Sequence, residues 1–296
     1  MVKNETGHRK SVIVTGASTG LGLEITLYLA EQGFNVYATM RDLSRRNLID
    51  TKAMQRGLKI EVLQLDITDR NSISTALETI IEQTGEIFAL INNAGIGLRG
   101  YFEDLSEEEI HKVFDVNLFG TMAVTRAVLP YMRSAGKGRI LIITSVGGLI
   151  GSLGVSAYCS TKFAQEGFGE SLSQELSPLG IHVSLIEPAI IKTERWGINR
   201  GNAKGAHDSG SLYSEWFRKS EILADKLVES SPTTPEHVAV KVYDALTARR
   251  PSLRYMVGYR AGLVVLLRRY LPHKLFDRLY FGEAVRRVTG YRKAFR

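Results

Sequence analysis

Tyr158 and Lys162 stand four residues apart in the run YCSTK, and Ser145 precedes the tyrosine by thirteen residues. Side chains four residues apart on a helix share one face, so a phenol and an ammonium can meet on one ligand. A nearby cation lowers the pKa of a phenol, and a phenolate accepts a proton from an alcohol. The Ser145 hydroxyl could polarise the same oxygen. These residues predict a site that transfers a proton to or from a substrate oxygen. Such a reaction also requires a binding site for a hydride carrier elsewhere in the chain.

A glycine-rich run, TGASTGLG, lies between a β-rich segment at Ser11–Thr15 and a helical segment at Leu21–Gln32. Glycines let the backbone approach a pyrophosphate closely, and a helix N-terminus offers N–H groups and a favourable dipole. Three glycines alone are weak evidence, and the spacing differs from the commoner G-x-G-x-x-G. The position between a strand and a helix predicts a dinucleotide site. Its expected residues are Gly16, Ser18, Thr19, Gly20, Leu21 and Gly22.

The end of the second predicted strand, Val36–Met40, usually decides which dinucleotide binds. A carboxylate there would bind the ribose hydroxyls and favour NAD. Arg41 stands there instead, and a guanidinium pairs well with a 2′-phosphate. We therefore expect NADP(H) in preference to NAD(H). A surface ion pair between Arg41 and the adjacent Asp42 is the alternative.

Two more segments follow predicted strands and could contact the cofactor. Asp66, with Ile67 beside it, follows the third strand, where a carboxylate could accept from the adenine amino group. It could equally cap the helix that follows. Asn93, Ala94 and Gly95 follow the fourth strand, where an amide and small residues either line a cofactor cleft or only form the turn.

Strand and helix signals alternate through the first two thirds of the chain, which predicts a single-domain, Rossmann-type α/β fold: a doubly wound parallel sheet with helices on both faces. The expected strands are Ser11–Thr15, Val36–Met40, Ile60–Leu65, Phe88–Asn92, Arg139–Thr144 and His182–Ile186. The expected helices are Leu21–Gln32, Asn71–Gln83, 109–133 with a break near Pro130, and Ala157–Leu176.

In combination, these motifs resemble the short-chain dehydrogenase/reductase family over roughly residues 10–195. The runs VYATMR, SVGGL and YCSTK look like its estradiol 17β-dehydrogenase and retinol dehydrogenase branch. The resemblance implies that Tyr158 is the general acid/base. It implies that Lys162 lowers the pKa of that phenol and holds the nicotinamide ribose, and that Ser145 binds and polarises the substrate oxygen.

The resemblance also implies roles for residues outside this set. Asn117 would stabilise the active-site geometry and a water-linked proton path. Pro188 and Thr193 would contact the cofactor. The family commonly has glycine after that proline, where this chain has Ala189. Because the family often pairs the helices that carry Asn117 and Tyr158, a homodimer or homotetramer is expected.

Residues 193–231 are polar, contain glycine and are weakly periodic, with aromatic residues interspersed. They predict a mobile substrate lid, from about residue 189 to 231, with one or two short helices; an ordinary surface insertion is the alternative. The expected substrate contacts are Ser145, Leu149, Leu153 and Tyr158. Leu149 and Leu153 are apolar, as are the aromatic residues of the lid, and they favour a hydrophobic ketone, aldehyde or alcohol, such as a steroid-, retinoid- or lipid-like compound.

The net charge of +7 conceals an asymmetry along the chain. Residues 249–296 contain 13 Lys+Arg and 2 Asp+Glu, whereas residues 1–248 contain 25 and 29. We expect residues 1–248 to form the catalytic domain and residues 249–296 to be a basic amphipathic extension packed on or beside it. That extension could be a solvated or oligomer-facing surface, or a peripheral attachment to an anionic membrane. Nucleic-acid binding is not favoured, because no recognised module accompanies the charge.

Other classes of protein do not fit this sequence. The single cysteine, Cys159, excludes an intrachain disulfide framework and offers no zinc cluster, so no metal site is expected. Residues 1–10 lack an apolar signal core and the apolar runs are too short to span a bilayer, which indicates a cytoplasmic protein. The sequence thus predicts an NADP(H)-dependent oxidoreductase. The alternative is a non-catalytic NADP(H)-sensing regulator or a membrane-associated adaptor on the same fold.

Overall fold

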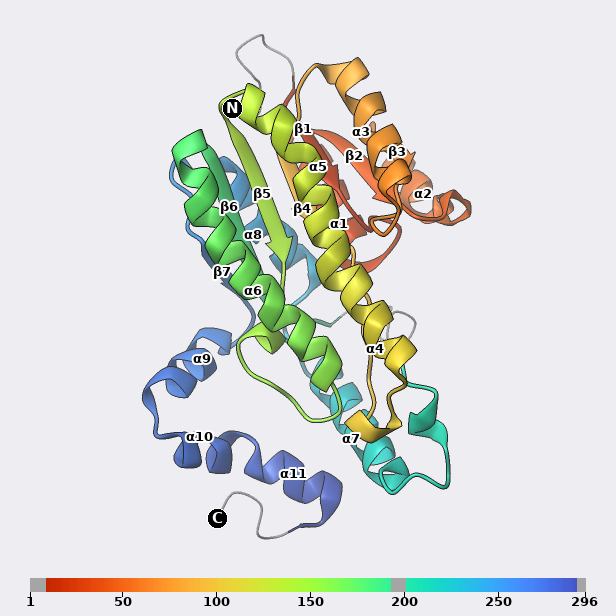
Figure 1. The fold of residues 1–296 in the computed structure, drawn as a ribbon, viewed down its shortest axis with the longest axis vertical. Helices are drawn as coiled ribbons and strands as arrows, with labels where there is room; N and C mark the ends of the chain where they lie inside the picture. The colour runs from red at the N-terminus through yellow and green to blue at the C-terminus, as the bar shows by residue number, and fades with distance from the viewer. Residues whose placement is uncertain (1–8, 193–200, 292–296) are drawn as a thin grey trace.

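The computed structural model describes residues 9–192 and 201–291. In this part of the chain, parallel strands form one seven-stranded sheet in the order β3-β2-β1-β4-β5-β6-β7 (Figure 1). The chain moves outward from β1 in one direction and then crosses to β4 on the other side, so the carboxyl ends of β1 and β4 flank a topological switch point. The strands are β1 Ser11–Val14, β2 Asn35–Met40, β3 Glu61–Gln64, β4 Ala89–Asn92, β5 Gly138–Ile143, β6 Ile181–Pro188 and β7 Arg254–Val257.

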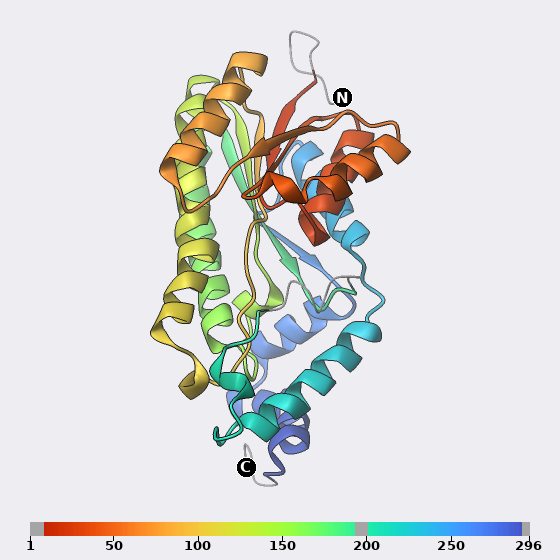
Figure 2. The same ribbon diagram turned by 90° about the vertical axis from the view of Figure 1, so that its right-hand side faces the viewer.

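Helices cover both faces of the sheet (Figure 2). One face carries α1 (Gly20–Glu31), α2 (Asn47–Gln55) and α8 (Pro235–Thr247). The other carries α3 (Arg70–Thr84), α5 (Thr121–Ser134) and α6 (Ser156–Leu176). Alternate side chains of β1 enter the two layers, since Val12 and Val14 pack with the first set and Ile13 with the second. The predicted doubly wound Rossmann-type sheet is therefore confirmed.

All six predicted strands are present, but the prediction missed β7. This strand lies inside the basic extension, where arginines interrupt any apolar period. It pairs in parallel with β6, with Leu185 opposite Arg254. Residues 249–296 are therefore not only an amphipathic addition, because their first strand completes the sheet. Helices α2 and α8 are also absent from the predicted set.

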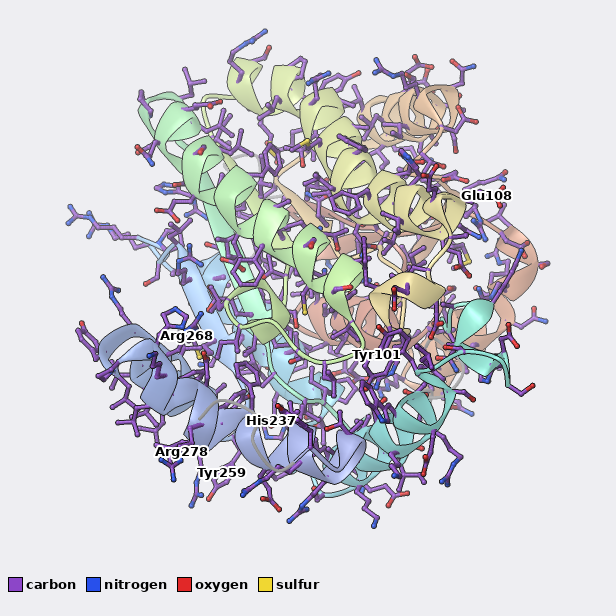
Figure 3. All side chains as sticks on the ribbon, turned by 60° about the horizontal axis from the view of Figure 1, so that its bottom comes forward. Tyr101, Glu108, His237, Tyr259, Arg268 and Arg278 are labelled. Atoms are coloured by element: carbon purple, nitrogen blue, oxygen red, sulfur yellow. The ribbon has the colours of Figure 1, made fainter. Side chains whose placement is uncertain are left out.

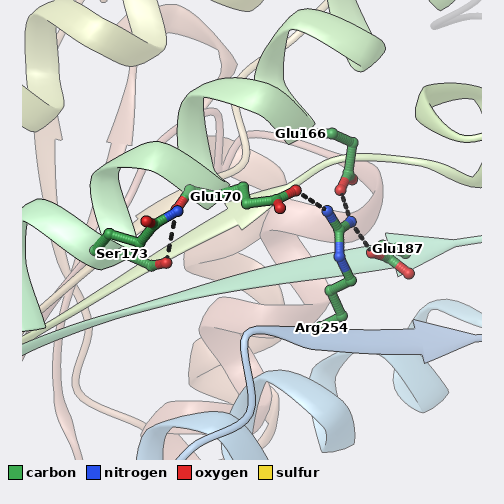
Figure 4. A network of polar contacts seen from close by, with 6 residues as sticks. Glu166, Glu170, Ser173, Glu187 and Arg254 are labelled. Carbon is green, nitrogen blue, oxygen red and sulfur yellow. Dashed lines mark hydrogen bonds and ion pairs between the residues drawn. The ribbon is translucent and has the colours of Figure 1, made fainter.

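Arg254 anchors β7 through three carboxylates (Figure 4). Its guanidinium donates to Glu187 at 2.8 Å and Glu170 at 2.9 Å, and also to Glu166. Glu187 is 1% exposed, so an unpaired charge there would be costly. Burial nevertheless raises the pKa of Glu187, against the lowering effect of the Arg254 hydrogen bond. The arginine thus ties the start of the extension to α6 and β6.

The helix expected over residues 109–133 is interrupted, but not at Pro130. It consists of α4 (Glu107–Phe114), a π-helical segment η3 (Asp115–Gly120) and α5, which continues past Pro130 to Ser134. The prediction of a break near Pro130 is therefore wrong. Val128 and Met132 are fully buried on either side of the proline, and this packing holds α5 on the sheet despite one missing hydrogen bond. The π-helical segment instead carries Asn117.

Beyond the carboxyl ends of the strands lie α7 (Ser214–Glu229), α9 (Ala261–Tyr270), α10 (His273–Tyr280) and α11 (Gly282–Thr289) (Figures 1 and 2). The 16-residue α7 replaces the short helices expected in the lid. Tyr213 stacks on Tyr101 at 5.0 Å between ring centroids, and Phe217 is buried beside them. These aromatic contacts, which join segments distant in sequence, stabilise a longer helix than the local pattern suggests. No described helix is long and apolar enough to cross a membrane.

Candidate active site

A cavity of about 990 Å³ opens beyond the carboxyl ends of the central strands. Most of the predicted catalytic and nicotinamide-side residues meet there: Gly20, Leu21, Asn93, Gly95, Asn117, Ser145, Leu153, Tyr158, Lys162 and Pro188. Other predicted residues do not line this cavity: Gly16, Ser18, Thr19, Gly22, Arg41, Asp66, Ile67, Ala94 and Leu149. Thr193 lies outside the described residues, as does the lid residue Trp196.

The glycine-rich turn has the geometry of a phosphate loop. Gly16 adopts φ +67° and Gly20 φ +59°, in the left-handed region that favours glycine. Asn93 supports the turn, because its Nδ2 donates to Thr15 O at 2.9 Å and to Gly16 O at 3.2 Å. A Cβ on Gly22 would overlap both Gly16 O and Asn93 Nδ2. The first turn of α1 contains no acidic side chain, so the loop and helix N-terminus fit a dinucleotide pyrophosphate.

Tyr158 and Ser145 form the polar centre of the cavity. Burial raises the pKa of Tyr158 to about 12, against a smaller lowering effect of the Ser145 hydroxyl. Burial of the phenol therefore opposes the lowering of its pKa that is expected from Lys162. The turn that follows Ser145 holds its side chain in place, since its Oγ accepts from the N–H of Gly147 at 3.0 Å. The pair presents a protonated phenol and a hydroxyl to the cavity.

Lys162 extends from α6 into a nearly closed site, where it is 6% exposed. Its Nζ donates to Ile143 O at 2.9 Å and to Gln165 Oε1 at 2.9 Å, and lies 5.8 Å from the centroid of the Tyr158 ring. Burial lowers the pKa of Lys162 to about 8, and the negative charge of Glu166 opposes this effect. An ammonium has three N–H donors, so these two contacts leave one for a ligand. At neutral pH the group is mainly charged.

Asn117 is fully buried and joins three elements. Its side chain accepts from Ile96 N at 2.8 Å, donates to Ile96 O at 3.0 Å and donates to Thr161 Oγ1 at 3.1 Å. The side chain therefore holds the loop after β4 against α6, as expected of a residue that stabilises the site. Its main-chain oxygen accepts from Gln165 Nε2 at 2.5 Å and from Thr121 Oγ1 at 2.8 Å.

Gln165 is the residue that sequence reasoning missed. It bridges Lys162 and Asn117 through its side-chain amide. The only signal in the sequence is a long polar side chain three residues after Lys162, near the helix face that carries the lysine. Its partners on the π-helical segment become visible only in the folded chain.

Arg41 lies exposed at the end of β2, away from the cavity lining. The carboxylate of Asp42 accepts from Ser44 N at 2.9 Å, and no ion pair joins it to Arg41 among the described residues.

Asp66 accepts from Thr68 N at 2.9 Å instead of capping a helix. The alternative of Asp66 as helix cap is wrong, because Asp69 caps α3.

Two turn segments line the cavity, one after β4 and one after β6. Asn93 and Gly95 line the cavity, and Asn93 also supports the glycine loop, so this segment does more than form a turn. Ala189, at the position where the family commonly has glycine, donates its N–H to Val257 O at 2.8 Å. Its backbone does not adopt a positive φ, so alanine is tolerated there. Opposite it, Gly258 has φ +143° and provides room for the alanine Cβ.

Much of the remaining cavity wall is apolar, and a large part of it comes from α7 and the C-terminal helices. Among the described residues, the apolar side chains from these helices are Leu223, Ala224, Leu227, Val228, Ala261, Val264, Tyr280, Phe281, Ala284, Val285 and Val288. The polar Tyr158–Ser145 pair therefore lines a largely apolar chamber, which suits a hydrophobic molecule with one reactive oxygen.

Comparison with known proteins agrees with this geometry. The family description "short chain dehydrogenase" matches residues 10–202. Human 17-beta-hydroxysteroid dehydrogenase type 1 is 37% identical over 260 residues, which cover 85% of this chain and 78% of that protein. Bovine retinol dehydrogenase 8 is 35% identical over 270 residues, covering 89% and 86%.

Solved structures show the same likeness. A short-chain dehydrogenase from Streptomyces avermitilis has a TM-score of 0.76 at 30% identity, covering 93% of this chain and 98% of its own. A variant of the actinorhodin polyketide ketoreductase, solved with NADPH, has a TM-score of 0.73 at 26% identity, covering 86% and 97%.

Replacing Gly22 tests the phosphate loop. In Gly22→Ala, the new Cβ forces Gly16 and Asn93 to shift, at a cost of about 1–3 kcal/mol. We expect NADPH to bind about ten- to a hundredfold more weakly, measured by fluorescence titration.

Gly167→Ala on α6 is the matched control, since no atom beyond its chain neighbours and the adjacent helix backbone lies within 4 Å of its Cβ position. This variant should bind NADPH like the wild type and gain about 0.5–1 kcal/mol of stability. Wild-type affinity in Gly22→Ala would contradict the assignment of the loop.

Proposed function

The chain belongs to the short-chain dehydrogenase/reductase family, and on that premise we propose that it interconverts a ketone or aldehyde and the corresponding alcohol on a hydrophobic substrate, using NADP(H). One observation carries this proposal: Tyr158, Ser145 and Lys162 line a single, largely apolar cavity that the start of α1 also lines. The arrangement also argues against a non-catalytic sensor, which would need neither a buried lysine nor a phenol at a substrate cavity.

The proposed mechanism assigns a role to each polar group. In reduction, Ser145 and Tyr158 donate hydrogen bonds to the carbonyl oxygen and polarise it. Bound nicotinamide supplies the hydride to the carbonyl carbon. Tyr158 transfers its proton to the oxygen and becomes a phenolate, which the Lys162 ammonium stabilises. In alcohol oxidation the phenolate accepts the proton, so oxidation needs a higher pH than reduction.

The proposed substrate is steroid-, retinoid- or lipid-like. The cavity volume of about 990 Å³ and its apolar walls support a large hydrophobic molecule. Relatives at 35–37% identity are described as a 17-beta-hydroxysteroid dehydrogenase and a retinol dehydrogenase, which act on such compounds by name. Leu149 does not line the cavity, so Leu153 is the better candidate contact of the two.

A homodimer or homotetramer is also proposed, through the segments that carry Asn117 and Tyr158. Phe119 on η3 is 56% exposed and Phe163 on α6 is 46% exposed, so both segments present large apolar side chains to solvent. Such surfaces are typical of protein interfaces. Sedimentation equilibrium tests this proposal, and a monomer at every accessible concentration would contradict it.

Removal of the phenol tests the chemistry. In Tyr158→Phe we expect turnover of hydrophobic ketones with NADPH to fall by at least about a hundredfold, because the general acid is lost. The measurement is a screen of ketones and alcohols that follows nicotinamide absorbance. NADPH affinity should change little, since the glycine loop is untouched. Equal activity in Tyr158→Phe and the wild type would refute the mechanism.

Removal of the Arg41 guanidinium tests cofactor choice. A charge-assisted pair with a 2′-phosphate is worth about 1.5–3 kcal/mol, or roughly ten- to a hundredfold in affinity. In Arg41→Ala we expect kcat/KM for NADPH to fall by that factor, with kcat/KM for NADH nearly unchanged. Arg45→Ala, a few residues further along, is the matched control. Parallel losses with both cofactors, or no loss with NADPH, would disprove the preference.

The C-terminal helices support a second proposal, attachment to an anionic membrane surface. Leu263, Leu266, Leu267 and Tyr270 are all exposed, and their spacing of three, four and seven residues places them on one face of α9. Leu275 and Leu279 are exposed on α10. An uncovered apolar stripe of this kind is typical of a helix that lies in a bilayer interface.

Charge favours a membrane over a second copy of the chain as the partner of this stripe. Arg269, Lys274 and Arg278 flank it, and none of them forms an ion pair with a carboxylate among the described residues. Figure 3 shows Arg278 together with Arg268 on these helices. A two-fold contact would bring these like charges face to face, which is unfavourable. Anionic headgroups would instead neutralise them. The same helices line the cavity, so a lipophilic substrate would enter from the membrane side.

Vesicle flotation tests the attachment. We expect the wild type to float with vesicles of phosphatidylcholine and phosphatidylserine, and less at high salt. Leu263→Ser combined with Leu266→Ser and Leu267→Ser should weaken binding by about tenfold or more, because each buried leucine contributes roughly 1 kcal/mol or more. Leu212→Ser, which changes an 87% exposed leucine elsewhere, is the control. No flotation of the wild type, or equal flotation of the triple variant, would contradict this proposal.

A further inference from the structure

Gln165 connects the proposed catalytic lysine to the π-helical segment. It lies on α6 three residues after Lys162 and is 1% exposed. Its Oε1 accepts from Lys162 Nζ at 2.9 Å. Its Nε2 donates to the main-chain oxygen of Asn117 at 2.5 Å and to Thr121 Oγ1 at 3.2 Å. Both N–H donors and the carbonyl oxygen of this buried amide are therefore used.

The chemistry of the partners gives the amide a single orientation. The ammonium of Lys162 can only donate, and the carbonyl of Asn117 can only accept. A flipped amide would set its NH₂ against the ammonium and its oxygen against the carbonyl. In a buried site both mismatches are costly. Gln165 therefore presents a fixed acceptor to Lys162.

The main-chain oxygen of Asn117 is available to Gln165 because of the local backbone. Asn117 belongs to η3, where the wider π-helical turn alters the regular hydrogen-bond ladder. Two side chains, Gln165 and Thr121, bond that oxygen. The Gln165 amide thus links the main chain of Asn117 to the ammonium of Lys162.

We propose that Gln165 is a positioning residue for Lys162, which holds the ammonium in place beside Tyr158 and keeps it charged within the protein interior. This inference rests on the proposed oxidoreductase function, because the charge of Lys162 acts there on the phenol. Without the amide, the ammonium would keep only the carbonyl of Ile143 as an acceptor among its described contacts. The charged form would then lose a charge-assisted hydrogen bond, and the neutral amine would be favoured.

Other charged and titratable groups face this lysine and must stay constant in the test. Tyr158 and Glu166 lie on the same helix, and Glu166 raises the pKa of Lys162. Behind Glu166 lie Glu187 on β6 and Arg254 on β7, joined in one network (Figure 4). Gln165 itself is uncharged, so its replacement by an uncharged residue changes the hydrogen bonding of Lys162 and leaves this network intact.

The test compares two substitutions of similar size. In Gln165→Met the acceptor is lost, and we expect the pKa of Lys162 to fall by about one unit or more. In Gln165→Glu the acceptor for Lys162 is kept and a negative charge is added, while the N–H donors to Asn117 O and Thr121 Oγ1 are lost, so the pKa of Lys162 should rise. The direct readout is the pH titration of the lysine ε-carbon by NMR, assigned with Lys162→Met, which requires neither cofactor nor turnover.

The second readout is the pH profile of alcohol oxidation, whose sign follows from the mechanism. Oxidation needs the Tyr158 phenolate, and a less charged Lys162 lowers the pKa of that phenol less effectively. The rising limb of kcat/KM should therefore move to higher pH in Gln165→Met and to lower pH in Gln165→Glu. A purely structural role would reduce kcat in both variants without moving the limb.

Several outcomes decide the proposal. If Lys162 titrates at the wild-type pH in Gln165→Met, the proposal is wrong, whatever happens to kcat. If the titration shifts but the wild type turns over no substrate, the role of Gln165 stands and the proposed function fails. If Gln165→Met does not fold, Gln165→Asn takes its place, since the shorter amide cannot span from Lys162 to Asn117.

Discussion

A buried ammonium is the constraint on which the site depends. The charge of Lys162 must lie inside the protein to act on Tyr158, yet burial favours its neutral form. The surrounding structure compensates with the carbonyl of Ile143, the amide of Gln165 and the nearby charge of Glu166. Each comes from a position that the sheet and α6 must hold in register. The catalytic arrangement therefore places demands on the core as well as on the cavity.

The support of Lys162 also involves two elements distant from it in sequence, η3 and β7. Gln165 needs the carbonyl that η3 provides, so the irregular helical turn is part of the lysine's support. Glu166 and Glu187 would repel each other without Arg254, which β7 supplies from the basic extension. The extension thus serves the active site in two ways. Its strand neutralises the carboxylates behind Lys162, and its helices form an apolar wall of the cavity.

The state of Tyr158 follows from the same balance of burial and charge. Its raised pKa keeps the phenol protonated, which suits donation of a proton to a carbonyl oxygen. A phenolate in this site would need the ammonium of Lys162 nearby, because its desolvation is otherwise uncompensated. In the proposed mechanism, catalysis would therefore depend on how firmly the Lys162 ammonium is held, a property that no single residue determines.

Local pattern in the sequence was enough to predict β1 to β6, the glycine-rich turn and the candidate set of Ser145, Tyr158 and Lys162, because short-range periodicity and spacing specify strands, turns and helix faces. Features that depend on contacts between segments distant in sequence were decided only by the tertiary structure. Strand β7 exists because β6 offers an edge and carboxylates for Arg254. The long α7 depends on aromatic rings from Tyr101 and its neighbours. The role of Gln165 and the raised pKa of Tyr158 depend on burial, which a linear pattern of residues does not reveal.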